Sequence, residues 1–211
     1  MWLPSGYQAH DELETRRSRF RATLVRTDDE EAARTAVAAA RRAHPDARHH
    51  CSAYIVEIPD ANPVERSSDD GEPPGTAGMP MLDVLRASGL TNATVVVTRW
   101  FGGVKLGTGG LVRAYSAATD LVVAAAPRVR PVRRTVFAID LDHAAAGRVQ
   151  ADLVARGVEI TDATWAERVT LQLTHPDDAV LRDVVAHVTH GGAIPREVDQ
   201  VVIEVPVVAP H

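Results

Sequence analysis

The segment at residues 127–134 constrains the fold most, because it interrupts the chain where a helical pattern ends. It contains Pro127 and Pro131 together with four arginines, and it follows a short run of alanines. Proline has no backbone N–H to donate and cannot continue a helix. We interpret the segment as a linker and place a boundary after Pro131, which predicts two domains, residues 1–131 and 132–211. A length of 211 residues allows one or two domains.

Beyond this boundary the hydrophobic repeat alternates between that of a strand and that of a helix. Phe137 and Ile139 share one side of an expected strand, and Val149 and Leu153 share one side of an expected helix. The expected elements are a strand at 135–141, a helix at 144–156, strands at 158–160 and 169–173, a helix after Asp178 that Gly191 ends, and a strand at 201–205. This order, βαββαβ, predicts a ferredoxin-like C-terminal domain.

The N-terminal domain is also expected to mix strands with helices, so the chain as a whole is predicted to be α+β. A β-branched run at residues 94–99 is typical of a buried strand. Thr27 and the acidic residues after it favour a helix start, because their side chains can cap free amides. The other expected elements are strands at 20–25 and 51–58, a polar loop at 60–75, and helices through residues 82–86 and 111–126.

Charge, cysteine content and hydropathy exclude several classes of protein. The formal net charge is -5 and lies wholly in the C-terminal domain, because residues 1–131 are charge-balanced. Such a chain is not a general nucleic-acid coat, which needs an excess of Lys and Arg, so any nucleic-acid contact must use a local patch. The single cysteine fits a reducing cytosol, and no uncharged stretch exceeds 12 residues, which predicts a cytoplasmic protein without a membrane span or signal peptide.

A glycine-rich segment between an expected strand and an expected helix is the first candidate site. Its glycines are Gly102, Gly103, Gly107, Gly109 and Gly110. Glycines let a backbone approach a partner closely, and amides at a helix N-terminus attract anions. Arg99, Lys105 and Arg113 add positive charge, so the segment is a candidate anion or nucleic-acid site. It matches neither a Walker loop nor a dinucleotide-binding loop. The alternative is tight packing of a strand against a helix.

The second candidate site is the acidic segment formed by Asp69, Asp70 and Glu72. Three carboxylates in four residues could hold a hard cation such as Mg²⁺. They could equally pair with Arg99 and Arg113, or face solvent. Thr76, next to the amides of two glycines, forms a second anion-binding helix start. Cys51 is expected in the core, because it shares a strand side with apolar residues.

Both candidate sites also carry a resemblance to a known family. The residues are Ser68-Asp69-Asp70-Gly71-Glu72-Pro73-Pro74-Gly75-Thr76-Ala77-Gly78 and Val96-Val97-Thr98-Arg99-Trp100-Phe101-Gly102-Gly103-Val104-Lys105-Leu106-Gly107-Thr108-Gly109-Gly110-Leu111-Val112-Arg113-Ala114-Tyr115. With Arg17-Ser18-Arg19-Phe20 and His50-Cys51-Ser52-Ala53-Tyr54, they resemble the signature of the IMPACT family in its YigZ-type bacterial form. Trp100 departs from the family pattern, which commonly has tyrosine there.

The resemblance implies the fold of each domain and a role in translation. The N-terminal domain would have the ribosomal-protein domain-2-like α/β fold shared with domain IV of elongation factor G. The C-terminal domain would be similar to domain V of that factor. Eukaryotic members restrain a starvation-responsive translation kinase by competing for its activator. The resemblance supplies no catalytic residues and no cofactor.

These observations favour a non-enzymatic, translation-associated regulator. Arg99, Lys105, Arg113 and the glycine amides would contact phosphates of RNA or a ribosomal surface, with a salt slope of about -2 to -3 for three cationic contacts. One alternative is a metal-assisted hydrolase that uses Asp69, Asp70 and Glu72. Another is a pure protein-binding module with Trp100 and Phe101 as anchors, in which case the partner is a protein rather than RNA or the ribosome.

Overall fold

The computed structural model describes residues 1–207, which divide into two compact units. The first unit comprises residues 1–130 with residues 205–207, and the second comprises residues 131–204. The last four residues of the expected C-terminal domain, 208–211, lie outside the described residues. Each unit combines helices with one β-sheet, so the predicted two-domain α+β class is confirmed. No helix in the described part of the chain is long and apolar enough to cross a membrane.

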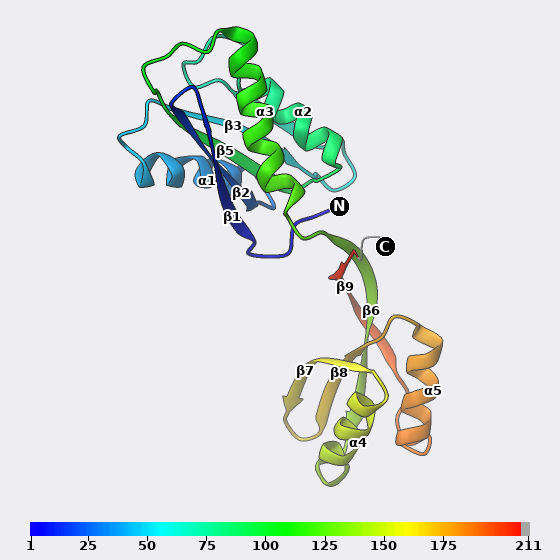
Figure 1. Ribbon diagram of the computed structural model, residues 1–211. Helices are drawn as coiled ribbons and strands as arrows, with labels where there is room; N and C mark the ends of the chain where they lie inside the picture. Colours follow the sequence, from blue (N-terminus) through cyan, green and yellow to red (C-terminus); the bar gives the residue numbers. More distant parts are fainter. Residues whose placement is uncertain (208–211) are drawn as a thin grey trace. The chain divides into compact units, whose positions relative to one another are not determined.

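The first unit is built on a five-stranded sheet with the strand order β1-β2-β5-β3-β4 (Figure 1). All of its neighbouring strands are antiparallel. Its elements are β1 (Gln8–Thr15), β2 (Ser18–Arg26), α1 (Glu30–Ala43), β3 (His49–Val56), β4 (Val64–Ser68), α2 (Gly78–Ser88), β5 (Ala93–Trp100) and α3 (Thr108–Ala124). As the sequence predicts, α1 begins at a cap: the Asp29 carboxylate accepts a hydrogen bond from the amide of Ala32.

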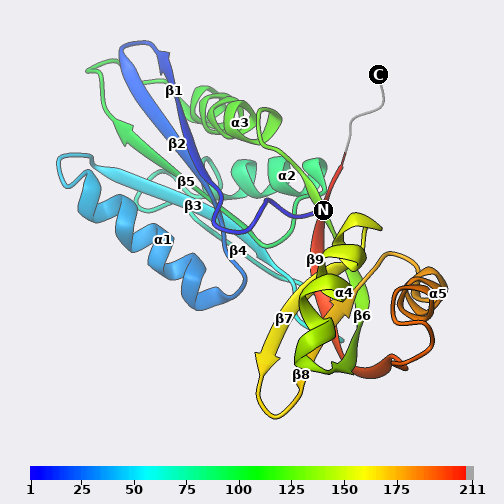
Figure 2. The same ribbon diagram turned by 90° about the horizontal axis from the view of Figure 1, so that it is seen from below.

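Helices cover both faces of this sheet. Figure 2 shows α1 across one face, with α2 and α3 across the other. Because β5 is the central strand and both of its faces are covered, every residue from Ala93 to Arg99 is buried. On the face below α3, the rings of Phe20 and Tyr115 meet edge to face at a centroid distance of 5.2 Å. This contact fixes α3 over β2, immediately after the glycine-rich segment.

The second unit has the predicted βαββαβ order and a four-stranded sheet with the order β7-β8-β6-β9, the ferredoxin-like arrangement. Its elements are β6 (Val129–Leu141), α4 (His143–Ala155), β7 (Glu159–Trp165), β8 (Val169–Thr174), α5 (Asp178–Val188) and β9 (Arg196–Pro206). Its core contains Phe137, Ile139 and Leu153, as the periodicity predicts. The Asp177 carboxylate caps α5 by accepting from the amides of Ala179 and Val180.

Three parts of the secondary structure differ from the sequence-based expectation. The linker predicted at residues 127–134 is largely the start of β6, and Pro131 lies there before the pairing with β8 begins at Phe137. Proline suits such a position because its missing N–H leaves no gap in the ladder with β8, which pairs only from Phe137 onward. β1 and β4, which the sequence leaves unassigned or in a loop, are the two edge strands. Edge strands carry polar and charged side chains, so they show little hydrophobic alternation.

Candidate nucleic-acid interface

The loop of residues 101–107, here called the glycine loop, connects β5 to α3. Its Lys105 is exposed. Gly107 stands at the N-cap of α3 with a φ of 72°, and no side chain of residues 1–207 caps the helix. The first hydrogen bond of α3 runs from the amide of Leu111 to Gly107. The amides of Thr108, Gly109 and Gly110 therefore have no protein acceptor within residues 1–207, and they are open to an anion.

The turn between β1 and β2 supports the glycine loop. Arg16 and Arg17 form this turn, with φ values of 46° and 65°. Two-residue hairpin turns of this kind usually contain asparagine and glycine, since other residues rarely adopt positive φ. Gly102 lies directly against the turn: a Cβ atom there would be 1.9 Å from the carbonyl oxygen of Arg17. The Gly102 amide also donates to Ser18 Oγ at 3.2 Å. The turn and the loop thus form one structure.

Positive side chains gather on two clefts that meet at Leu106 in the glycine loop. Arg16 and Arg113 line one cleft of about 290 Å³, which also contains Glu14. Arg48 and Lys105 line the other, of about 450 Å³. In the described residues no ion pair or hydrogen bond engages any of these four cations. We call Arg16, Arg17, Arg48, Lys105 and Arg113 the basic loop surface.

Local sequence patterns do not identify all of this surface. Glu12 and Glu14 lie close in sequence to the arginines of the β1–β2 turn, but Glu12 pairs with Arg21 at 2.9 Å. Register explains this, because Glu12 and Arg21 face each other across the hairpin. Arg48 precedes β3 and reaches the site only through the fold, so no local pattern points to it.

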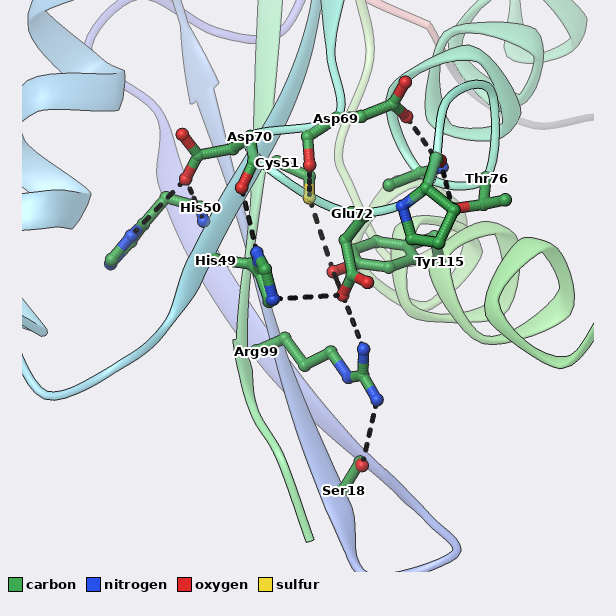
Figure 3. Close-up of polar contacts among 12 residues, drawn as sticks. Ser18, His49, His50, Cys51, Asp69, Asp70, Glu72, Thr76, Arg99 and Tyr115 are labelled. Carbon is green, nitrogen blue, oxygen red and sulfur yellow. Dashed lines mark hydrogen bonds and ion pairs between the residues drawn. The ribbon is translucent and has the colours of Figure 1, made fainter. Parts of the chain in front are cut away.

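Arg99 does not lie on the basic loop surface, contrary to the sequence-based expectation. Its side chain is only 7% exposed, and its Nη1 donates to Glu72 Oε1 at 2.6 Å (Figure 3). Burial requires the guanidinium to be paired, since an unpaired charge in the interior is very unfavourable. Arg99 therefore serves as the internal partner of Glu72 and does not contact phosphate groups on the surface.

Glu72 and its neighbours form a buried polar network. Glu72 Oε1 accepts a second hydrogen bond from the Tyr115 hydroxyl at 2.8 Å. Burial raises the pKa of Tyr115, so its hydroxyl stays protonated and can donate. The Cys51 sulfur lies 3.3 Å from the Tyr115 oxygen, and burial raises the pKa of Cys51 to about 12. Cys51 is therefore a protonated core thiol, as the sequence predicts.

The helix start at Thr76 is already occupied by an anion from the protein itself. The Asp69 carboxylate accepts from the amides of Gly75, Ala77 and Gly78 at 2.8–2.9 Å. Although burial alone would raise the pKa of Asp69, these three N–H groups hold it below its usual value. Thr76 Oγ1 donates to the carbonyl of Pro73. The expectation of an external anion at Thr76 is wrong for this reason.

The three carboxylates proposed as a metal site point to separate partners. Asp69 caps α2, Glu72 pairs with Arg99, and Asp70 accepts from the His50 amide and from Arg41. Within residues 1–207, no three His, Cys, Asp or Glu side chains are placed to hold a metal ion. The carboxylates of the acidic segment serve as helix caps and ion-pair partners. They do not converge on one point, as the hydrolase alternative requires.

Replacing Asp69 by alanine is expected to lower the free energy of unfolding by about 1–2 kcal/mol, because the N-terminus of α2 loses its capping carboxylate. The folded-state pKa of Asp69 lies below the unfolded value of about 3.9. Its contribution is therefore present above that pH and is lost as the pH falls through the folded pKa. Urea unfolding of both proteins from pH 7 to pH 2.5 should show their difference shrinking only below about pH 4. A difference that stays constant would contradict this assignment.

Comparison with known proteins identifies the family. Residues 16–123, which contain the basic loop surface and the Glu72 network, match the model of the Impact N-terminal domain. The chain is 38% identical to the IMPACT family member YigZ of Escherichia coli, over 77% of this chain and 80% of that one. It is 40% identical to an IMPACT family member of Haemophilus influenzae over a similar share. A crystal structure described as that of a hypothetical protein covers 93% of this chain at 33% identity and a TM-score of 0.60. The chain belongs to the IMPACT family.

Proposed function

We propose that this protein is a non-enzymatic, cytoplasmic regulator of translation that binds RNA or the ribosome through the basic loop surface. Membership of the IMPACT family supports the link to translation, which the resemblance of the sequence implies. The observation that carries the proposal is the gathering of unpaired cations around the open amides of α3. No cofactor is part of the proposal. The likeness of the second unit to domain V of elongation factor G stays a prediction.

The arrangement of charge favours contact with phosphate groups. The whole chain has a net charge of -5, yet these five cations lie together and have no ion-pair partner within residues 1–207. Lys and Arg that neutralise phosphates release counterions, so the affinity falls as salt increases. Without the buried Arg99, the five cations of the basic loop surface supply up to five phosphate contacts. The logarithm of the binding constant should then fall with the logarithm of salt concentration with a slope of about -3.5 to -4.5.

Replacing Lys105 by alanine is expected to reduce the salt slope by about one and to weaken RNA binding without sequence preference. The reason is the loss of one phosphate contact, while the fold is unchanged because Lys105 is exposed on the loop. Co-sedimentation with purified ribosomes and anisotropy with a fluorescent RNA, both over a salt series, measure the effect.

Arg156→Ala is the matched control, since Arg156 is an exposed cation in the second unit. Like Lys105→Ala, it removes one positive charge, but it should leave the salt slope as in the wild type. Equal losses from both variants would show that overall charge matters rather than the loop. Absence of salt-sensitive binding to ribosomes and RNA in the wild type would overturn the proposal.

A protein partner is the second candidate, because two apolar side chains are exposed on the glycine loop. Phe101 and Val104 are 51% and 40% exposed. Trp100 is not available as an anchor, since its Nε1 donates to Asp46 and its ring lies against Arg19. An association through Phe101 should survive nuclease and high salt, whereas an RNA-bridged one should not.

A further inference from the structure

The 450 Å³ cleft beside Lys105 contains more than a surface of positive charge. Its lining includes Glu72, Pro73, Phe101, Lys105, Leu106 and Thr108. Clefts of this size can enclose a small ligand or one unit of a longer one. The inner part of the cleft, unlike its mouth, contains hydrogen-bonding atoms for which residues 1–207 provide no partner.

The first of these groups is the Glu72 carboxylate at the inner end of the cleft. The side chain is 4% exposed, and both of its hydrogen bonds, from Arg99 and Tyr115, go to Oε1 (Figure 3). In the described residues Oε2 has no donor, and it is not enclosed by the protein, so it can accept a hydrogen bond from a ligand. Arg99 also lines the cleft, but its Nε, which has no acceptor within residues 1–207, is enclosed and out of reach of a ligand. Since polar groups on buried side chains are normally hydrogen-bonded, the free Oε2 indicates that a ligand supplies its donor.

The second group is the imidazole of His49, which lines the same cleft. Its Nδ1 lies 2.9 Å from the carbonyl oxygen of Asp70, and a carbonyl can only accept, so Nδ1 carries the hydrogen. In the neutral ring, Nε2 is then an acceptor, and it lies 4.0 Å from Glu72 Oε1. His49 and Glu72 therefore present neighbouring acceptors, which call for a donor on the ligand.

The mouth and the wall of the cleft favour other chemical groups on the ligand. Lys105, Arg48 and the free amides at the start of α3 favour a phosphate group. Phe101, half exposed, offers a ring on which a base can stack. A ligand that fits must combine a phosphate, a planar apolar group and a hydroxyl that donates a hydrogen bond.

We propose that this cleft binds one ribonucleotide unit of single-stranded RNA and distinguishes it from DNA. The phosphate lies at Lys105 and the α3 amides, the base stacks on Phe101, and the ribose 2′-hydroxyl enters between Glu72 and His49. That hydroxyl donates its hydrogen to these neighbouring acceptors, Glu72 Oε2 and His49 Nε2. DNA lacks the 2′-hydroxyl and leaves the acceptors without a donor. This inference rests on the proposed function and assigns RNA as its ligand.

The test compares an eight-nucleotide oligouridylate with the deoxy oligomer of the same sequence, by fluorescence anisotropy at one salt concentration. The wild type should bind the RNA about tenfold more tightly, as expected for one or two additional hydrogen bonds. Glu72→Gln and His49→Phe should each bring the ratio of RNA to DNA affinity close to one. His49→Gln, which keeps an acceptor, should retain part of the preference. Lys105→Ala should weaken both oligomers equally.

Circular dichroism verifies that each variant is folded. If Glu72→Gln does not fold, His49→Phe at the partly exposed rim still tests the site. Equal binding of RNA and DNA by the wild type, weakened by Lys105→Ala, would overturn the ribonucleotide cleft and leave the proposed function standing. Failure to bind either oligomer or ribosomes would overturn both.

Discussion

Replacing Glu72 by alanine is expected to lower the free energy of unfolding of the first unit by about 3–5 kcal/mol. The substitution leaves the Arg99 guanidinium, 7% exposed, without its counter-charge, and it removes the acceptor of the Tyr115 hydroxyl. Because folded proteins are stable by only about 5–15 kcal/mol, this is a large share of the total. Urea unfolding measures it in a Trp165→Phe background, where the remaining tryptophans, Trp2 and Trp100, both lie in the first unit.

The double variant Glu72→Leu/Arg99→Met is the matched control. Removing both charges leaves no buried ion unpaired, and apolar replacements of buried ion pairs are often neutral or stabilising. The double variant should therefore be more stable than Glu72→Ala, even though it carries more changes. If Glu72→Ala costs less than about 1 kcal/mol, Arg99 finds water or another partner, and the network is not the internal ion pair described here.

The fold could be predicted from the sequence wherever one side of an element is apolar and the other is polar. The strand containing Phe137 and Ile139 and the helix containing Leu153 follow their periodicity directly. β1 could not be predicted in this way, because its residues are largely exposed at the edge of the sheet. The position of β1 depends on its pairing with β2, and this pairing leaves little hydrophobic alternation in the sequence of β1.

The candidate site could be predicted only in part, for a related reason. The five glycines and Lys105 mark the loop in the sequence itself. Whether Arg99 faces solvent depends on Glu72, which lies 27 residues away and on another segment. The same holds for Asp69, which caps a helix that begins nine residues later. The sequence identifies groups that can bind an anion. The fold determines which of these groups are already paired with a carboxylate of the protein.

Replacing Gly102 by alanine should cost at least the upper end of the about 1–3 kcal/mol typical of overpacked sites. The new Cβ would lie 1.9 Å from the Arg17 carbonyl oxygen and 2.5 Å from the Ser18 amide nitrogen. These are backbone atoms, so no side-chain rotation relieves the clash. The β1–β2 turn, whose arginines already have positive φ, must move away from the loop by about 1 Å to reach contacts that real Cβ atoms show.

This displacement should also weaken RNA binding, since it separates Arg16 and Arg17 from Lys105 and breaks the hydrogen bond from Gly102 to Ser18. Gly109→Ala provides the control in the same segment, because its Cβ would meet only the Arg113 side chain, at an ordinary 3.6 Å. Within the first turn of α3, that alanine should be neutral or stabilising by up to about 1 kcal/mol. If Gly102→Ala is as stable as Gly109→Ala and keeps the RNA affinity, the turn does not need to lie against the loop. The basic loop surface would then be two independent patches rather than one.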